Sequence, residues 1–250
     1  MYPVIFQWGK ITIASYGTML VCAFLTCYFL TKYEFKRLNL PEKLVEDLIF
    51  FAMIGGIVGS KIYFLFENFK AFLDNPIKMA FSTSGFTAYG GFFLAVMLCI
   101  YAIKKAKVKI ITVTDAVAPM LAIGYGIGRI GCQLAGDGCY GIPSSLPWAM
   151  AYPNGVIPTL QAVHPTPVYE TIYGITLFAV LWLLRKKDFK PGRLISIYLI
   201  FTGLGRLLVE FIRLNEKVLF GLTGAQVIGI VAIVFGIWGV YKTRKQKVKA

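Results

Sequence analysis

Charged residues are scarce in this 250-residue chain. They make up 15% of it, whereas 57% of the residues are hydrophobic. A soluble domain carries roughly 25% charged residues. The mean hydropathy of +0.68 agrees with this imbalance. The composition therefore excludes an ordinary soluble protein and predicts an all-α polytopic membrane protein.

Histidine, acidic residues and cysteine are also few. The chain has one histidine, His164, and 12 acidic residues against 26 basic ones. Its five cysteines lie mostly inside apolar segments and show no metal-ligand spacing, so the sequence predicts no metal site. Two of them, Cys132 and Cys139, could both approach the outer face, where they could pair or stay free thiols.

Long apolar segments dominate the remainder. A helix needs about 20 residues to cross the hydrocarbon core, and about seven segments approach that length. We expect these seven to be transmembrane helices, of which the third is the shortest: 11–30, 48–66, 88–103, 116–134, 167–184, 194–212 and 222–241.

The net charge of +14 would suit a nucleic-acid-binding protein, but its distribution predicts a membrane topology instead. Eighteen of the 26 basic residues fall in four clusters, which follow the first, third, fifth and seventh segments. Cytoplasmic loops are enriched in Lys and Arg. We therefore expect no nucleic-acid partner, an N-terminus outside and a cytoplasmic C-terminus.

The chain shows no long linker and no convincing internal repeat, which predicts a single membrane domain over residues 1–250. Two outer connections are long enough to hold structure. Residues 67–84 mix phenylalanine with lysine, as in an interfacial segment that lies on the membrane. Residues 135–166 contain no Lys or Arg and are rich in Gly, Pro and Tyr, which predicts a small irregular head.

Polar residues inside the segments indicate a site. Arg129 and Arg206 lie at similar distances from the cytoplasmic ends of their segments, so we expect them at one depth. Arg206 and Glu210 share a helix face with Arg213. The same outer level is reached by Tyr16, Tyr89 and Asp137.

A buried charge in a membrane segment is costly and is often functional. Taken singly, Arg206 and Glu210 could be a plain intrahelical pair and Arg129 a snorkelling side chain. Taken together, the residues predict a buried polar cavity for an anion, because guanidinium binds phosphate oxygens bidentately. A phosphate at this depth belongs most simply to a phospholipid. The glycines at 126, 128 and 131 spell a dinucleotide-binding pattern, but that pattern counts only between a strand and a helix. In an apolar segment, close helix packing explains Gly124, Gly126 and Gly128 better.

Several motifs in this order resemble the bacterial prolipoprotein diacylglyceryl transferase family over nearly the full length. They are SYG at 15–17, GIVGSKIYFL at 56–65, YGG at 89–91, DAVAPMLAIGYGIGRIG at 115–131, LPWAMAYPN at 146–154, HPTPVYE at 164–170 and GLGRLLVEFIR at 203–213.

The resemblance implies an enzyme of the bacterial inner membrane that needs no cofactor. Its substrates would be phosphatidylglycerol, a membrane lipid, and the lipobox cysteine in the signal peptide of a prolipoprotein. Its product would be a thioether, with release of glycerol phosphate. By the resemblance, Arg129 would clamp the head group, Arg206 would stabilise the leaving phosphate, Glu210 would orient Arg206, and Tyr16 and Gly141 would shape the site.

The chain departs from the family pattern at three places. Tyr89, Gly90 and Gly91 stand where the family has HGG, Cys132 replaces a common Asn, and Asp137 stands in for a glutamate. The proton acceptor is therefore open among Asp137, Tyr89 and His164. The alternative function is a lipid-binding protein or transporter that holds anions with the same arginines and performs no chemistry.

Overall fold

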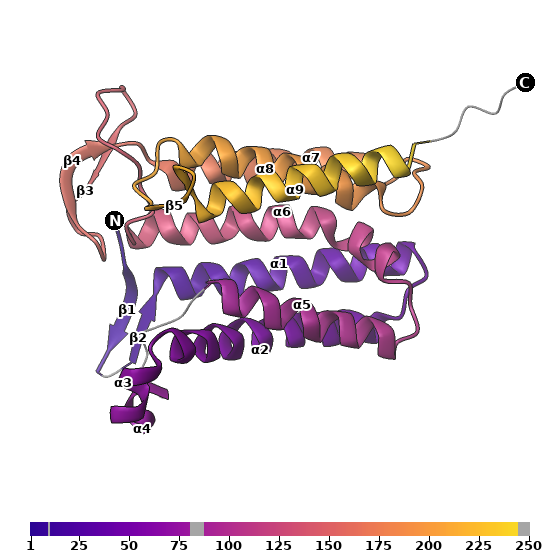
Figure 1. The fold of residues 1–250 in the computed structure, drawn as a ribbon, viewed down its shortest axis with the longest axis horizontal. Coiled ribbons are helices and arrows are strands. Elements are labelled where there is room, and N and C mark those ends of the chain that lie inside the picture. Colours follow the sequence, from indigo (N-terminus) through magenta and orange to yellow (C-terminus); the bar gives the residue numbers. More distant parts are fainter. Residues whose placement is uncertain (10, 81–87, 245–250) are drawn as a thin grey trace, which may run out of the picture. The chain divides into compact units, whose positions relative to one another are not determined.

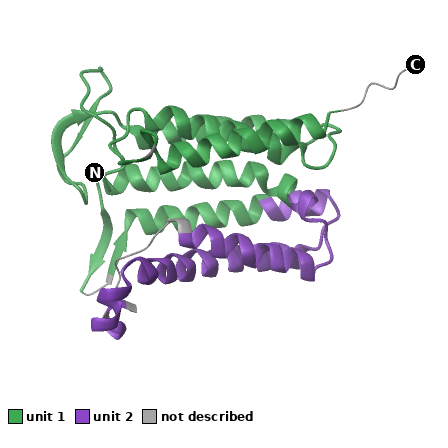
Figure 2. Ribbon diagram, viewed as in Figure 1, with its two compact units in different colours: residues 1–30, 114–250 green, residues 31–113 purple. Residues whose placement is uncertain are grey.

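The computed structural model describes residues 1–9, 11–80 and 88–244. The chain divides into two compact units, which Figure 2 colours separately. Unit 1 comprises Met1–Leu30 and Thr114–Ala250, and unit 2 comprises Thr31–Val113. Every charged residue that the sequence analysis assigns to the site belongs to unit 1.

Long helices make up most of the described residues (Figure 1), and seven of them have 18 or more residues. Each of the seven overlaps one of the predicted apolar segments. They are α1 (Ser15–Arg37), α2 (Glu42–Glu67), α5 (Ala88–Lys105), α6 (Ile110–Ala135), α7 (Thr166–Leu184), α8 (Arg193–Glu210) and α9 (Gly224–Lys242).

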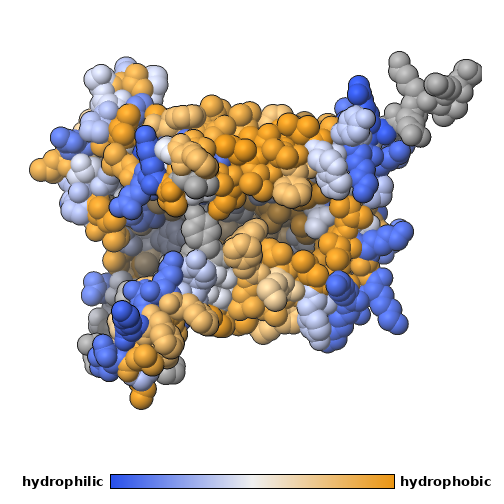
Figure 3. Space-filling view, in the orientation of Figure 1, coloured by the Kyte–Doolittle hydropathy of each residue, from blue (hydrophilic) through white to orange (hydrophobic). Residues whose placement is uncertain are grey.

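Four of these helices, α2, α6, α7 and α9, are long and apolar enough to cross a membrane. The helix α8 is less apolar because it carries Arg193, Arg206 and Glu210. On the face drawn in Figure 3, apolar side chains cover the middle of the α7–α9 region and hydrophilic ones gather at its ends. The fold is thus that of a helical membrane protein, while seven spans and their orientation stay predictions.

The core of unit 1 lies where α6, α7 and α8 meet. Its buried members are small or aliphatic: Ala118, Ala122, Leu177, Leu181 and Leu194. Nearer the N-terminus of α7, a Cβ atom on Gly174 would lie 2.9 Å from the Cα of Gly126 on α6. Small residues of this kind let two helix backbones approach closely.

The packing role predicted for the glycines of α6 is correct at two positions and wrong at a third. A Cβ atom on Gly126 would contact α7, and one on Gly124 would lie 3.0 Å from Cys27 Sγ of α1. At Gly128 it would meet nothing within 4 Å, because this residue faces away from both neighbours.

A carboxylate fixes the beginning of α8. Asp115 of α6 accepts hydrogen bonds from the backbone N–H groups of Gly192, at 2.6 Å, and Ile195, at 2.8 Å. The first N–H groups of a helix have no partner within the helix. Asp115 therefore caps α8 and ties its first turn to α6.

In unit 2, α2 packs against α5 through glycine. A Cβ atom on Gly55 would lie 2.5 Å from the Cα of Ala95. Gly59 and Gly90 contact each other backbone to backbone, and Gly91 lies against Ser60. These glycines bring the two helix axes close together.

The all-α prediction omits three antiparallel hairpins within the described residues. They are β1 (Val4–Trp8) with β2 (Ile11–Ala14), β3 (Met150–Tyr152) with β4 (Thr159–Val163), and β5 (Lys217–Leu219) with β6 (Leu222–Thr223). The first predicted segment is therefore wrong over residues 11–14, which are a strand. Their sequence, ITIA, begins with three β-branched residues, which favour extended backbone.

The expected head at 135–166 contains the hairpin β3–β4 and is otherwise irregular. Gly136 and Gly138 turn the chain at the end of α6 with φ angles of +60° and +83°, which L side chains rarely adopt. The ring centroids of Tyr140 and the fully buried Tyr152 lie 5.0 Å apart. Aromatic packing therefore gives this loop a small core of its own.

The segment expected to lie on the membrane contains two short helices, α3 (Phe69–Asp74) and α4 (Pro76–Ala80). Phe69, Leu73 and Ile77 are exposed on them. The end of the segment, residues 81–84, lies outside the described residues. Its place at the membrane surface stays a prediction.

Candidate active site

The carboxylate of Glu170 binds arginines from two other helices. Glu170 is one turn into α7 and is 3% exposed. Arg129 Nε of α6 lies 3.3 Å from Glu170 Oε2, and Arg206 Nη1 of α8 donates to Glu170 Oε1 at 3.1 Å. The structure thus brings together the two arginines that the sequence analysis expects at one depth.

Further groups complete what we call the arginine–glutamate cluster: Arg129, Arg206, Arg213, Glu170, Glu210 and Tyr125. Arg213 Nη1 lies 3.7 Å from Glu170 Oε1, to which the Tyr125 hydroxyl also donates. Arg206 Nη2 lies 3.3 Å from Glu210 Oε2. Because α8 ends at Glu210, Arg213 reaches the cluster from the turn that follows the helix, not from the helix face predicted for it.

The cluster combines burial with an excess of positive charge. Glu170 and Glu210 are each 3% exposed, so both carboxylates are almost fully removed from solvent. Three guanidinium groups face these two carboxylates, which leaves one positive charge over. Buried charges need partners, so the cluster as built favours an additional anion.

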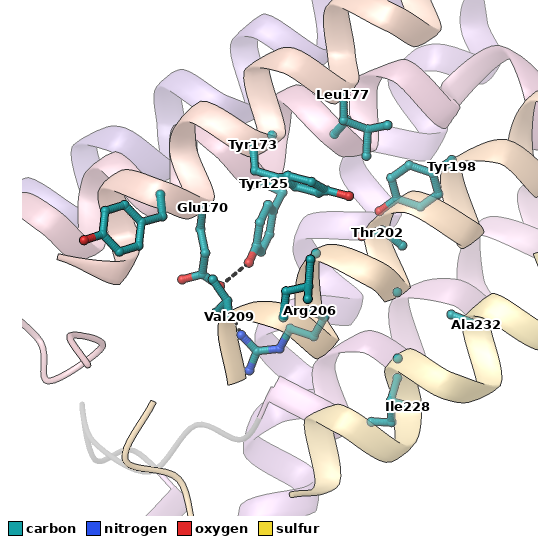
Figure 4. A pocket seen from close by; sticks show the side chains of 17 residues that line it. Tyr125, Glu170, Tyr173, Leu177, Tyr198, Thr202, Arg206, Val209, Ile228 and Ala232 are labelled. Atoms are coloured by element: carbon teal, nitrogen blue, oxygen red, sulfur yellow. Dashed lines mark hydrogen bonds and ion pairs between the residues drawn. The ribbon is translucent and has the colours of Figure 1, made fainter. Parts of the chain in front are cut away.

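A cavity of about 250 Å³ lies beside the cluster, between α6, α7, α8 and α9. Figure 4 shows Tyr125, Tyr173 and Tyr198 around it, with Arg206 reaching from α8 toward Glu170. The other end of the cavity is lined by small and aliphatic residues of α7–α9. The cavity is therefore charged at one end and apolar at the other, as an amphiphilic ligand requires.

The end of α6 places a second set of polar groups on Arg129. Its Nη1 lies 3.8 Å from Cys132 Sγ and 3.5 Å from Cys139 Sγ. Asp137 accepts a hydrogen bond from the Cys139 backbone N–H at 3.2 Å. Tyr16 of α1 packs against the same end of α6, because a Cβ atom on Gly131 would lie 3.2 Å from the Tyr16 ring. Tyr16 and Asp137 thus lie at the same end of α6 as Arg129, and Cys132, where the chain departs from the family pattern, contacts Arg129 directly.

The ligand atoms of Cys132, Asp137 and Cys139 lie within 4.8 Å of one another. This spacing would allow them to hold a soft metal ion, although the sequence predicts no metal. The Arg129 guanidinium beside both sulfurs repels a cation, so the electrostatics of the site oppose such binding.

His164 and Gly141 lie where the head meets α7. His164 Nδ1 is 3.3 Å from the hydroxyl of Tyr169, which also accepts a hydrogen bond from Trp148 Nε1 at 2.8 Å. Tyr169 lines the cavity, so His164 reaches the site through it. A side chain on Gly141 would strike the Ile212 carbonyl, because the backbone at 141 pairs with Arg213.

The remaining predicted positions, Tyr89, Gly90 and Gly91, belong to unit 2. The side chain of Tyr89 lies outside the part of the chain that the structure describes. Gly90 and Gly91 pack α5 against α2. Their part in substrate binding stays a prediction.

Three members of the cluster were not predicted as site residues: Glu170, Arg213 and Tyr125. The sequence does mark Glu170, because it is the one acidic residue in the apolar segment 167–184. An intramembrane carboxylate that has no basic partner on its own helix must find one on another. Sequence position gives the depth of such a residue, but it does not say which neighbour it faces.

The apolar helices and the buried cluster define a helical membrane protein with a charged site inside its helix bundle. A family model described as "Prolipoprotein diacylglyceryl transferase" matches residues 3–242. The chain belongs to this family of membrane enzymes.

Curated relatives agree over almost the whole chain. One from Clostridium tetani is 33% identical over 251 residues, covering 98% of this chain and 100% of the relative. Relatives from Bordetella avium and Methylococcus capsulatus are each 34% identical, covering 91% and 94% of this chain and 87% and 92% of their own lengths. All three are named phosphatidylglycerol–prolipoprotein diacylglyceryl transferase.

Proposed function

We propose that the chain transfers the diacylglyceryl group of phosphatidylglycerol to the lipobox cysteine thiol of a prolipoprotein, the first step of lipoprotein maturation. A sulfur–carbon bond forms at the glyceryl carbon, and the bond from that carbon to the phosphate oxygen breaks. The electron pair leaves with glycerol phosphate, and the thiol proton passes to a base.

The observation that supports this reaction most directly is the convergence of Arg129 and Arg206 on one buried carboxylate at the cavity. The departing phosphate gains negative charge as the carbon–oxygen bond breaks. Donors already oriented toward that charge stabilise the transition state most in a water-poor site. The surplus positive charge of the cluster is suited to this role.

Arg206 and Arg129 would bind different parts of the lipid head group. Arg206 lines the cavity and is held from both sides by Glu170 and Glu210. Its guanidinium is therefore oriented before substrate arrives, and we assign it to the leaving phosphate. Arg129 would clamp the rest of the head group, and Tyr16, Cys132, Gly141, Gly90 and Gly91 would shape the binding site.

The proton acceptor is proposed among three residues: Asp137, His164 and Tyr89. Asp137 lies beside Cys139, whose sulfur contacts Arg129. His164 lies one hydrogen bond from the cavity-lining Tyr169. A thiol has an ordinary pKa near 8.5, so either group would help it to become a nucleophile.

We further propose that all seven long helices span the bacterial inner membrane as one transferase domain. The N-terminus and the head at 135–166 would face the periplasm, and the C-terminus would face the cytoplasm. The four basic clusters would then all lie on the cytoplasmic side, as the positive-inside rule expects. The client would be the lipobox of an exported signal peptide.

The direct test uses purified chain with phosphatidylglycerol and a synthetic lipobox peptide. The peptide should gain the mass of one diacylglyceryl unit on its cysteine. Arg129→Ala and Arg206→Ala should each lower turnover by at least about a hundredfold, the usual cost of removing a transition-state charge donor. Arg244→Ala is the matched control, because Arg244 is exposed beyond α9.

Thermal unfolding of each variant separates lost chemistry from lost folding. Lipid binding without peptide modification by the intact chain would replace the transferase with the non-catalytic lipid-binding alternative. Undiminished turnover in a folded Arg129→Ala or Arg206→Ala variant would contradict the assigned site.

A further inference from the structure

Two thiols contact the arginine assigned to the lipid head group. Cys132 Sγ and Cys139 Sγ lie 3.8 Å and 3.5 Å from the same Arg129 nitrogen, and within 4.8 Å of each other. Both cysteines are free. No role in the proposed reaction requires a second thiol at this place.

The backbone holds the second thiol against the first. Cys132 is in the last turn of α6, and the left-handed residues Gly136 and Gly138 reverse the chain after it. The Cys139 backbone N–H donates to Asp137, and its carbonyl accepts from the Thr166 hydroxyl. The loop therefore returns Cys139 to the helix end in a fixed position.

The surroundings favour a reactive thiolate at position 139. The hydrogen bond from Cys132 lowers the pKa of Cys139 to about 7, and the charge of Arg129 acts in the same direction, against burial and Asp137. The thiolate is the form of cysteine that attacks disulfides. Cys132 lies next to it as the resolving thiol.

We propose that Cys132 and Cys139 form a redox-active dithiol, and that its oxidation to a disulfide frees Arg129 to bind a phosphate-bearing lipid more tightly. The oxidant is a disulfide compound. The Cys139 thiolate attacks one of its sulfurs and releases a thiol, and Cys132 then displaces the second thiol as the internal bond forms. Two thiols lose two protons and two electrons, and the disulfide of the oxidant is reduced.

The effect on Arg129 follows from charge. In the reduced state the Cys139 thiolate is an internal anion 3.5 Å from the guanidinium, so it competes with a lipid phosphate. A disulfide carries no charge and removes this competitor. The lipid part of the inference rests on the proposed function, whereas formation of the disulfide does not.

The first measurement is chemical. The full chain in zwitterionic nanodiscs is treated with oxidised glutathione or with a reducing agent, alkylated and mass-mapped. Oxidation should block alkylation at both positions and lower the mass of the chain by two hydrogen atoms, without retained glutathione. Cys132→Ser and Cys139→Ser should abolish this product, whereas Cys22→Ser, which alters an exposed thiol on α1, should not. Two alkylated thiols after full oxidant exposure would overturn the inference.

The second measurement is the affinity for dioctanoyl phosphatidylglycerol at pH 8, where Cys139 is largely ionised when reduced. Oxidation should tighten binding about fivefold, the low end of ordinary coupling between two sites. Cys139→Ser should bind like the oxidised chain and should not respond to oxidant. Unchanged or weaker binding by the disulfide form would overturn the coupling.

Neither the thiol mapping nor the lipid-binding measurement requires the chain to turn over substrate. Failure of the transferase reaction would therefore leave the redox result standing. Binding of dioctanoyl phosphatidylcholine, which carries a compensating positive charge, is the control for changes in the apolar part of the cavity.

Discussion

Glu170 is the residue on which the charge balance of the site depends. Arg129, Arg206 and Arg213 all meet its carboxylate, and Tyr125 donates to it. Without that carboxylate, three guanidinium groups would share the single charge of Glu210. Breaking a buried ion pair by removing one partner costs about 3–5 kcal/mol.

Glu170→Gln should therefore lower the unfolding temperature of the chain in zwitterionic nanodiscs markedly. An anionic phosphate lipid should restore part of the loss, because it supplies the missing charge to the arginines. Differential scanning fluorimetry in phosphatidylcholine and phosphatidylglycerol nanodiscs checks both statements. Glu46→Gln, an exposed change on α2, is the control and should have little effect. Equal stability of Glu170→Gln and the parent chain would contradict the central role of Glu170.

At the scale of helices and strands, glycine sets how closely the helices pack. Gly55 and Gly56 are neighbours on α2, yet a side chain would strike α5 only at position 55. A Cβ atom at 55 would lie 2.5 Å from the Cα of Ala95, whereas one at 56 would meet nothing within 4 Å.

Gly55→Ala should therefore force α2 and α5 apart and lower the unfolding temperature. Gly56→Ala should leave it unchanged or raise it, since alanine favours a helix by about 1 kcal/mol over glycine. Thermal unfolding of the two variants side by side measures the difference. The same loss in both would show that the contact with Ala95 does not limit the packing.

The helices could be predicted because their apolar segments are long and have charged residues at their ends. The hairpins were not, because a short run such as ITIA at 11–14 continues an apolar segment without a break in composition. Likewise, depth along a segment predicted that Arg129 and Arg206 would meet. Which face of a helix meets a neighbouring helix depends on packing. The sequence therefore did not predict that Glu170 lies between Arg129 and Arg206, or that Gly128 faces away from the neighbouring helices.

At the scale of the whole molecule, the distribution of charge implies a topology. The connection that contains the head has no Lys or Arg, whereas the loop between α7 and α8 contains four. The positive-inside rule places these two loops on opposite sides of the membrane.

Cysteine substitutions test this arrangement in intact cells. Ser145→Cys, in the head, should react with a membrane-impermeant maleimide added from outside. Lys187→Cys should react only after the membrane is opened. Both positions are exposed, and labelling is read against the parent chain with its native cysteines. Reaction of both from the same side would contradict the proposed orientation.

The cap that Asp115 places on α8 has a consequence for sequence length. It fastens α6 to α8 at one end, and Glu170 joins them again through Arg129 and Arg206. Arg129 is fourteen positions after Asp115 along the chain, and Arg206 is thirteen positions after Arg193. At 1.5 Å per residue, these two stretches of helix are about 21 Å and about 20 Å long. One inserted residue in either would turn its arginine by about 100°, so both stretches should accept substitutions far more readily than a change in length.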